Sequence, residues 1–245
     1  MAPRRFDEPL AGADRPAQLL GQVACVLALL AAITVTHRAV ALHEALGSLP
    51  HALRTAVQLP LFAPLPALLW WFTRSDPSRK ATFGFRRVPL SKAIGWGGLA
   101  LVGGFVCFVL FAMTYLGLTG GSDRKPPAVV QDILRHASLW GLLALSATAG
   151  FLEEAFFRGF VLGRLVRALR GWALTRKRSA LLAVGASAAA FALSHAYQGG
   201  AHAFGAFGFG LVYAAVMLRC GSIWPLVVAH FCNDALFFVS RYGSG

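Results

Sequence analysis

Residues 93–118 have the sequence AIGWGGLALVGGFVCFVLFAMTYLGL, a run of 26 residues without a single charged side chain. An α-helix needs about 20 apolar residues to cross the hydrocarbon core of a bilayer, so this run predicts a transmembrane helix. The rest of the chain has the same character: 57% of the 245 residues are hydrophobic and 13% are charged, whereas soluble domains carry about a quarter charged residues. The sequence therefore predicts an integral membrane protein that lies in a lipid bilayer.

Six further apolar segments predict the rest of the architecture, which we expect to be an all-α, polytopic transmembrane bundle of about seven spans. They cover approximately residues 17–36, 52–72, 138 to beyond 158, 180–197, 201–218 and 222–239. Ahead of them lies a polar tail, residues 1–16, and we interpret the first span as an uncleaved signal anchor. Residues 17–137 contain the first three spans and a short interfacial helix at 126–136. Residues 138–240 form a separate core that carries every unusual polar residue.

The basic residues predict how the bundle is oriented. The tail and the gaps at 74–92, 163–179 and 219–221 hold sixteen Lys and Arg residues, whereas the alternate gaps and the C-terminus hold six. Since cytoplasmic loops are enriched in Lys and Arg, we expect a cytoplasmic N-terminus and an external C-terminus. This distribution also explains the net charge of +13 without a nucleic-acid partner. The four cysteines form no CxxC pair, and we expect them to act as small hydrophobic residues and not to form a disulfide framework.

Five ionisable residues lie inside two of the predicted spans, where charge is costly. Glu153, Glu154 and Arg158 lie in the fourth span, and His230 and Asp234 lie in the seventh. Each acidic or Arg side chain at the centre of a span costs about 2.5–3.5 kcal/mol of insertion free energy. The four residues of this kind therefore cost on the order of 10 kcal/mol before pairing: Glu153, Glu154, Arg158 and Asp234. Residues of this kind usually face the interior of the bundle and serve a function.

The spacing of these residues predicts different roles for the two glutamates. Glu154 and Arg158 are four apart, so they share a helix face and form an ion pair. Glu153 is turned about 100° from Glu154 and has no partner at helical spacing. A carboxylate held in an apolar pocket can take a proton from water and return it, so we expect Glu153 to be a general base.

Two histidines on separate spans complete the candidate site. His195 ends the fifth span, and Phe191 one turn earlier is expected to form a wall of the pocket. His230 shares a face with Asp234, which can orient the imidazole, and Asn233 is a competing hydrogen-bond donor. We expect the remaining histidines to be loop or interface residues: His37, His43, His51, His136 and His202.

Together these residues resemble a known family. Glu153-Glu154-Ala-Phe-Phe-Arg158, Phe191-Ala-Leu-Ser-His195 and His230-Phe-Cys-Asn-Asp234 follow the order EExxxR, FxxxH and Hxxx(N/D). This set is similar to the CAAX protease and bacteriocin-processing (CPBP, or Abi) family of intramembrane endopeptidases. The resemblance covers residues 138–240 and makes this segment the expected catalytic core.

The resemblance implies a glutamate-type peptidase mechanism. Glu153, helped by His195, would activate a water that attacks a peptide carbonyl. His230 and Asp234 would stabilise the oxyanion or hold the site in shape. The family often has Asn at the last position, and Asp234 cannot donate to an oxyanion unless it is protonated, so Asn233 or His230 would supply the donor.

No cofactor is favoured, but zinc is an open alternative. Many members of the family are labelled metalloproteases, and Glu153, His195 and His230 are residue types that bind zinc. The sequence lacks HExxH, and its three candidate ligands come from three separate spans. We therefore favour a metal-free site.

The resemblance implies a membrane-associated protein or peptide substrate. Candidates are a prenylated CAAX-type tail, a leader peptide, or a C-terminal sorting tail of the kind cut by the myxosortase branch. His195 is expected toward the external face, which favours a sorting or secretion substrate. The expected location is a bacterial inner (plasma) membrane.

Three rival interpretations stay open. A rhomboid-type serine protease needs a GxSG nucleophile, and Gly185-Ala-Ser187-Ala lacks the second glycine. A proton-coupled transporter also uses intramembrane Glu, Arg and His, although the two halves show no inverted repeat. A catalytically silent scaffold or immunity protein is the third.

Overall fold

The computed structural model describes residues 16–38, 64–74, 83–121 and 138–242, and every regular element within them is helical. This confirms the all-α prediction. The elements are α1 (Pro16–Arg38), α4 (Pro64–Thr73), α6 (Leu90–Leu118), α8 (Leu139–Glu153), η2 (Glu154–Val161), α9 (Leu162–Gly171), α10 (Arg176–His195), η3 (Ala196–Gln198), α11 (Gly200–Cys220) and α12 (Trp224–Tyr242).

The described helices match the seven predicted apolar segments. Four are long and apolar enough to cross a membrane: Leu90–Leu118, Leu139–Gly171, Arg176–Gln198 and Gly200–Cys220. Pro16–Ala32 and Trp224–Ser240 are shorter apolar helices, and α4 covers the end of the second predicted span. The chain is thus a polytopic helical membrane bundle. The polar tail, the start of the second span and the interfacial helix expected at 126–136 lie outside the described residues.

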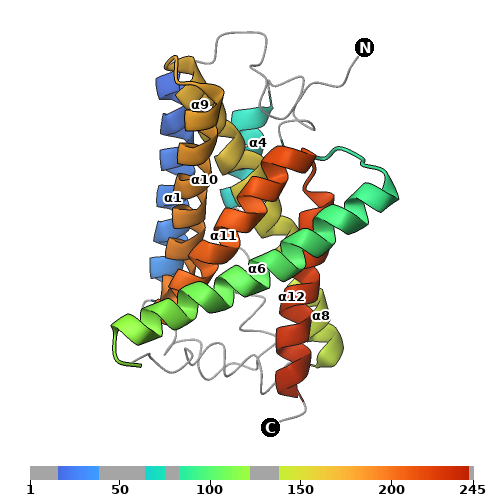
Figure 1. Cartoon of the computed structure of the whole chain (residues 1–245). Coiled ribbons are helices and arrows are strands. Elements are labelled where there is room, and N and C mark those ends of the chain that lie inside the picture. Colours follow the sequence, from blue (N-terminus) through green and yellow to red (C-terminus); the bar gives the residue numbers. More distant parts are fainter. Residues whose placement is uncertain (1–15, 39–63, 75–82, 122–137, 243–245) are drawn as a thin grey trace.

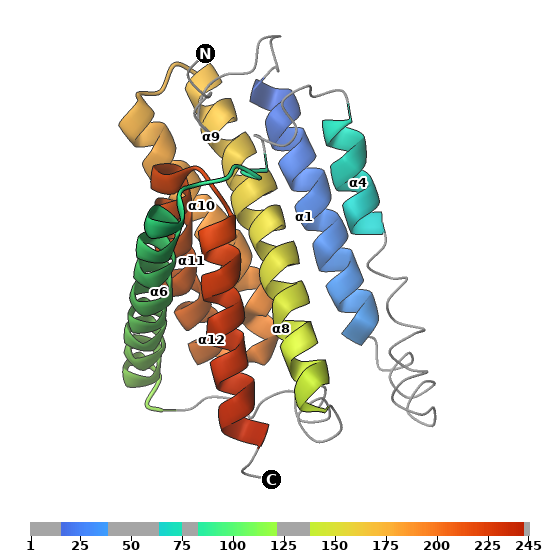
Figure 2. The ribbon, with the colours of Figure 1, turned by 90° about the vertical axis from the view of Figure 1, so that its right-hand side faces the viewer.

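A continuous rod built from α8, η2 and α9 runs through the bundle (Figure 2). The pair α1 and α4 lies on one side of the rod, and α6, α10, α11 and α12 lie on the other. Figure 1 shows α6 crossing obliquely over α11 and α12. The rod is 33 residues long, which corresponds to about 50 Å of helix. Glu153 and Glu154 lie near its middle, so they lie well inside the bundle.

Small residues allow α6 to lie close to α11. A Cβ atom added to Gly208 would lie 2.7 Å from the Cys107 carbonyl oxygen, and one added to Gly104 would lie 2.7 Å from the Tyr213 ring. No real Cβ atom tolerates such contacts, so both positions require glycine. Close approach through small residues is how helices associate in lipid.

The middle of the rod is a π-helix, which the sequence analysis did not anticipate. Over Glu154–Val161 the wider turn carries Glu154 and Arg158, and all eight residues are buried. Ser187 Oγ on α10 donates to the Phe157 carbonyl at 3.1 Å and so anchors this segment. Gly159 admits a second chain segment, because a Cβ atom there would lie 2.9 Å from the Phe83 carbonyl oxygen. π-Helical turns are rare and occur frequently at functional sites.

The helix order places the described basic segments at one end of the bundle. Arg74 follows α4, Lys92 lies in the first turn of α6, Arg170 ends α9, Arg176 begins α10 and Arg219 lies in the last turn of α11. These helix ends lie together at the top of Figure 2. We refer to this end as the basic end. The opposite end carries η3 and the start of α11.

Candidate active site

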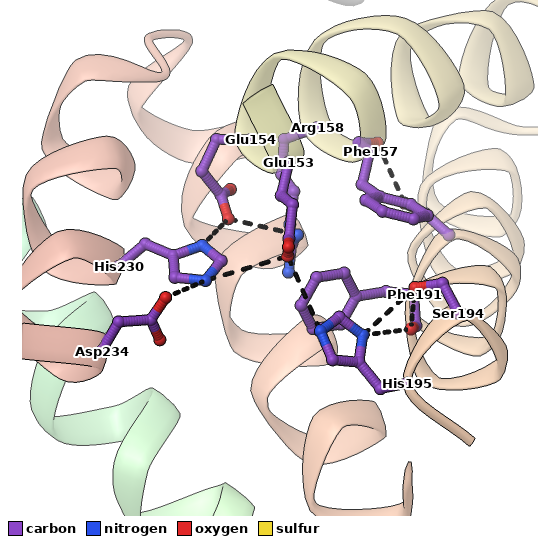
Figure 3. A network of polar contacts seen from close by, with 10 residues as sticks. Glu153, Glu154, Phe157, Arg158, Phe191, Ser194, His195, His230 and Asp234 are labelled. Atoms are coloured by element: carbon purple, nitrogen blue, oxygen red, sulfur yellow. Dashed lines mark hydrogen bonds and ion pairs between the residues drawn. The ribbon is translucent and has the colours of Figure 1, made fainter. Parts of the chain in front are cut away.

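The ionisable residues of the three sequence motifs meet inside the bundle (Figure 3). Glu153 ends α8, Glu154 and Arg158 lie in η2, His195 ends α10, and His230 and Asp234 lie on α12. Three separate spans therefore converge on one place, as the sequence analysis expected. The structure gives their positions, and their catalytic roles remain predictions.

The centre of this cluster is the fully buried carboxylate of Glu154. Its Oε1 lies 3.2 Å from Arg158 Nη1, and the two side chains are 0% and 1% exposed. The ion pair expected from the four-residue spacing is thus present. The Arg158 guanidinium carbon lies 4.3 Å from the centre of the Phe191 ring, 5.4 Å from that of Tyr213 and 5.9 Å from that of Phe209. Aromatic faces attract a cation that is removed from water, so these rings help to hold the arginine.

Glu154 also binds His230, a contact that helical spacing does not predict. His230 Nδ1 lies 2.8 Å from Glu154 Oε1. A carboxylate paired with an arginine is an acceptor, so Nδ1 carries the proton, and Nε2 of a neutral imidazole has a lone pair. Asp234 Oδ2 lies 3.6 Å from Nε2, beyond hydrogen-bond range. The idea that Asp234 orients this imidazole through a direct bond is therefore wrong, since Glu154 from another helix does so.

Glu153 differs from Glu154 in exposure and in contacts. Its side chain is 30% exposed, against 0% for Glu154. Glu153 Oε2 lies 3.7 Å from His195 Nε2 and 3.9 Å from His230 Nε2, and it forms no hydrogen bond with any residue that the structure describes. Two imidazole nitrogens from two helices therefore face one carboxylate oxygen. The Glu153 side chain is thus partly exposed, although its Oε2 atom is buried, and the Glu154 side chain is fully buried.

The imidazole of His195 is held by its own helix. Its Nδ1 lies 2.9 Å from the Phe191 carbonyl oxygen and 3.1 Å from Ser194 Oγ. A carbonyl oxygen only accepts, so Nδ1 carries the proton and Nε2 presents a lone pair to Glu153. The ring lies 4.4 Å from that of Phe191, centre to centre. Phe191, which was predicted to form a wall of the pocket, is buried and its ring contacts His195.

Sequence analysis missed one nearby aromatic residue. His202, in the first turn of α11, stacks on His195 with ring centres 5.8 Å apart, and Phe108 of α6 contacts it edge-on at 5.2 Å. His202 was expected at a loop or interface position; it is partly exposed at the start of α11, and its ring also contacts His195. Its position at the start of a span, beyond the FxxxH motif, did not indicate that it contacts His195. Asn233 is partly exposed and is not part of the network in Figure 3.

Other residues singled out in the sequence have structural positions. Ser187 is buried and donates to η2, with no acid or imidazole on its hydroxyl. The four cysteines are free, which agrees with their predicted role. Among the described residues, no set of three or more His, Cys, Asp or Glu side chains is arranged to hold a metal ion.

Comparison with known proteins gives one match. Residues 135–236 match the family described as type II CAAX prenyl endopeptidase Rce1-like. The matched segment is less than half of the chain, contains all three motifs and supports the resemblance to CAAX-processing endopeptidases. No curated protein and no solved structure matches the chain.

Proposed function

We propose that the protein is an intramembrane endopeptidase in which Glu153 activates a water molecule. The observation that carries the proposal is the approach of two imidazole Nε2 atoms, of His195 and His230, to one buried carboxylate oxygen, Glu153 Oε2, which has no hydrogen-bond partner among the described residues. The ionised carboxylate is an acceptor, and so is Nε2 of each imidazole while the ring is neutral and protonated on Nδ1. Such a set favours a molecule with donors at its centre, and water has two.

In the proposed reaction, Glu153 takes a proton from this water while the water oxygen attacks a peptide carbonyl carbon. The carbonyl becomes a tetrahedral oxyanion. Glu153 then returns the proton to the amide nitrogen as the carbon–nitrogen bond breaks, leaving a carboxylic acid and an amine. General base catalysis of this kind contributes about 10²–10⁴-fold in rate. No step runs through a metal.

His230 is the proposed oxyanion donor. Its Nε2 accepts from the water while the ring is neutral, and it can donate to the oxyanion only after Nε2 is protonated. Arg158 Nη1 pairs with Glu154 Oε1 at 3.2 Å. His195, with its proton on Nδ1, accepts from the water and aligns it toward Glu153.

The proposed substrate is the tail of a membrane-associated protein, cut in the external half of the bilayer. His195 is the last residue of α10 and Arg176 the first, so the site lies about 28 Å along that helix from the basic end. If the basic end faces the cytoplasm, the site lies toward the outside. This favours a C-terminal sorting tail or a leader peptide, at a bacterial plasma membrane, over a cytoplasmic CAAX tail.

Proteolysis in reconstituted vesicles tests this function. Prenylated CAAX, leader and sorting-tail peptides are incubated with wild type, Glu153→Gln and Ser187→Ala, each with and without a zinc chelator. We expect one peptide class to be cut, Glu153→Gln to cut it at least a thousandfold more slowly, and Ser187→Ala to match wild type. Cleavage by Glu153→Gln at the wild-type rate contradicts the mechanism. Loss of cleavage with the chelator indicates a metal enzyme, and proton-coupled uptake without cleavage indicates a transporter.

A further inference from the structure

The orientation of His195 depends on a residue outside the three motifs. Ser194 directly precedes His195 and occupies one of the unspecified positions of the FxxxH motif. Its Oγ donates to the Phe191 carbonyl at 2.7 Å and lies 3.1 Å from His195 Nδ1. The same carbonyl lies 2.9 Å from Nδ1. Serine hydroxyl, imidazole and carbonyl therefore form a closed triangle at the end of α10 (Figure 3).

The direction of each hydrogen bond in this triangle follows from chemistry. The carbonyl oxygen only accepts, so the serine hydroxyl and Nδ1–H both donate to it. Because the Ser194 hydroxyl already donates its proton to the carbonyl, its oxygen can act only as an acceptor toward His195. The Nδ1–H group therefore donates to both the Ser194 oxygen and the Phe191 carbonyl oxygen. With two acceptors on Nδ1, the imidazole is fixed as the Nδ1–H tautomer.

The tautomer matters because of what lies on the other side of the ring. Nε2 is 3.7 Å from Glu153 Oε2. In the Nδ1–H tautomer Nε2 carries a lone pair and can accept a proton from a water shared with Glu153. In the opposite tautomer Nε2–H would donate a hydrogen bond to the Glu153 carboxylate, so the lone pair that Glu153 needs as a general base would be occupied.

A hydroxyl bonded to a preceding carbonyl is common in helices and has no function by itself. Ser146 on α8 and Thr148 do the same, at 2.9 Å from the Leu142 carbonyl and 2.8 Å from the Ala144 carbonyl. Both hydroxyls donate to backbone carbonyls, and neither forms a hydrogen bond with an imidazole of the described residues. Ser194 differs from them because its hydroxyl oxygen also contacts an imidazole nitrogen, His195 Nδ1.

We propose that Ser194 is a positioning residue that keeps His195 in the Nδ1–H tautomer, with its Nε2 lone pair directed at Glu153. The proposal deepens the proposed peptidase function and rests on it for the effect on rate. The tautomer itself is independent of any activity. A hydroxyl-bearing side chain at position 194 is therefore required for full turnover, and its main contribution is to the chemical step.

The test has a spectroscopic part and a kinetic part. ¹⁵N-histidine-labelled protein is prepared as wild type, Ser194→Ala, Ser194→Thr and the control Ser146→Ala, with His195→Gln used to assign the signal. We expect the nitrogen shifts of His195 to report Nδ1–H in wild type, in Ser194→Thr and in Ser146→Ala. In Ser194→Ala they should move part of the way toward the opposite tautomer, because the Phe191 carbonyl is then the one remaining acceptor for Nδ1–H in the triangle.

For cleavage we expect Ser194→Ala to lower kcat about three- to tenfold, which is the range for one lost hydrogen bond, with KM unchanged. Ser194→Thr should restore kcat and Ser146→Ala should not change it. Unaltered nitrogen shifts in Ser194→Ala overturn the proposal, whether or not cleavage is found. Altered shifts with unaltered kcat, while Glu153→Gln is inactive, also overturn it. Absence of any cleavage by wild type refutes the peptidase function and leaves the nitrogen shifts to decide the tautomer.

Discussion

The Nδ1 atom of His230 lies 2.8 Å from Oε1 of Glu154, although 76 positions separate the two residues in the chain. This single bond joins α12 to the π-helix at the middle of the bundle. Since Glu154 also pairs with Arg158, one buried carboxylate fixes a cation on its own helix and an imidazole on another. The structural and the chemical parts of the site therefore depend on the same residue.

The buried pair is expected to be coupled in stability. Glu154→Gln keeps an acceptor for His230 but leaves the Arg158 charge without a counterion, and Arg158→Met leaves the Glu154 charge unpaired. Each change should cost about 3–5 kcal/mol of unfolding free energy, and the double variant should lose much less than the sum. Thermal unfolding of the four proteins in detergent measures this. Additive losses would show that the two charges do not depend on each other.

Gly150 sets the distance between α8 and α12. A Cβ atom there would lie 3.2 Å from the Phe231 backbone nitrogen and 3.3 Å from the Val227 carbonyl oxygen, and backbone atoms yield poorly. Gly150→Ala should therefore displace α12, lengthen the bond from His230 to Glu154 and lower kcat about tenfold or more.

Gly185 on α10 is the matched control for this prediction, because a Cβ atom there meets nothing within 4 Å. Gly185→Ala should keep wild-type cleavage and gain slightly in stability from its better helix propensity. Cleavage assays on both variants, with circular dichroism to check the fold, make the comparison. Equal activity of the two variants would mean that the spacing of α8 and α12 does not control the site.

Asp234 is expected to tolerate an amide where Glu153 does not. Asp234 Oδ2 lies 3.6 Å from His230 Nε2, so the carboxylate contributes charge without a hydrogen bond. Asp234→Asn should keep cleavage within about tenfold of wild type, because the amide gains a donor for the oxyanion while it loses that charge. Kinetics of Asp234→Asn and Glu153→Gln side by side decide the matter. A thousandfold loss in both would make Asp234 an essential acid or base.

The basic end is expected to face the cytoplasm. In a variant without its native cysteines, Trp172→Cys places a thiol between α9 and α10 at the basic end, and Thr119→Cys places one after α6 at the opposite end. A membrane-impermeant maleimide should label Thr119→Cys in intact cells, and Trp172→Cys after the membrane is opened. The reverse labelling pattern would turn the site toward the cytoplasm and favour a CAAX-type substrate.

The sequence predicted the spans and the residues of the site for physical reasons. Uncharged runs such as 93–118 have few alternatives to a membrane helix, and Glu153 and Arg158 are conspicuous because charge inside such runs is costly. The pairing of Glu154 with Arg158 followed from helical spacing alone. Local rules therefore identified which residues belong together within one helix.

Contacts between helices were not accessible in this way. The bond from Glu154 to His230 and the stacking of His202 on His195 depend on how α8, α10, α11 and α12 pack, and spacing within a helix carries no information about that packing. The π-helix was missed because EAFFRGFV contains no residue that distinguishes it from an ordinary helix. Its wider turn follows from packing around Arg158 and Gly159.

The contact of Gly159 with the Phe83 backbone has a consequence for how the chain can be divided. A second link of the same kind joins Ile223 N–H to the Gly84 carbonyl at 3.0 Å, and a third joins Ser222 Oγ to the Arg86 carbonyl at 2.6 Å. All three run from the motif-bearing half to a short stretch that precedes α6. The half that resembles known endopeptidases is therefore not expected to be active when it is expressed alone, because it lacks the stretch that packs against the π-helix. Co-expression of the missing half should restore activity.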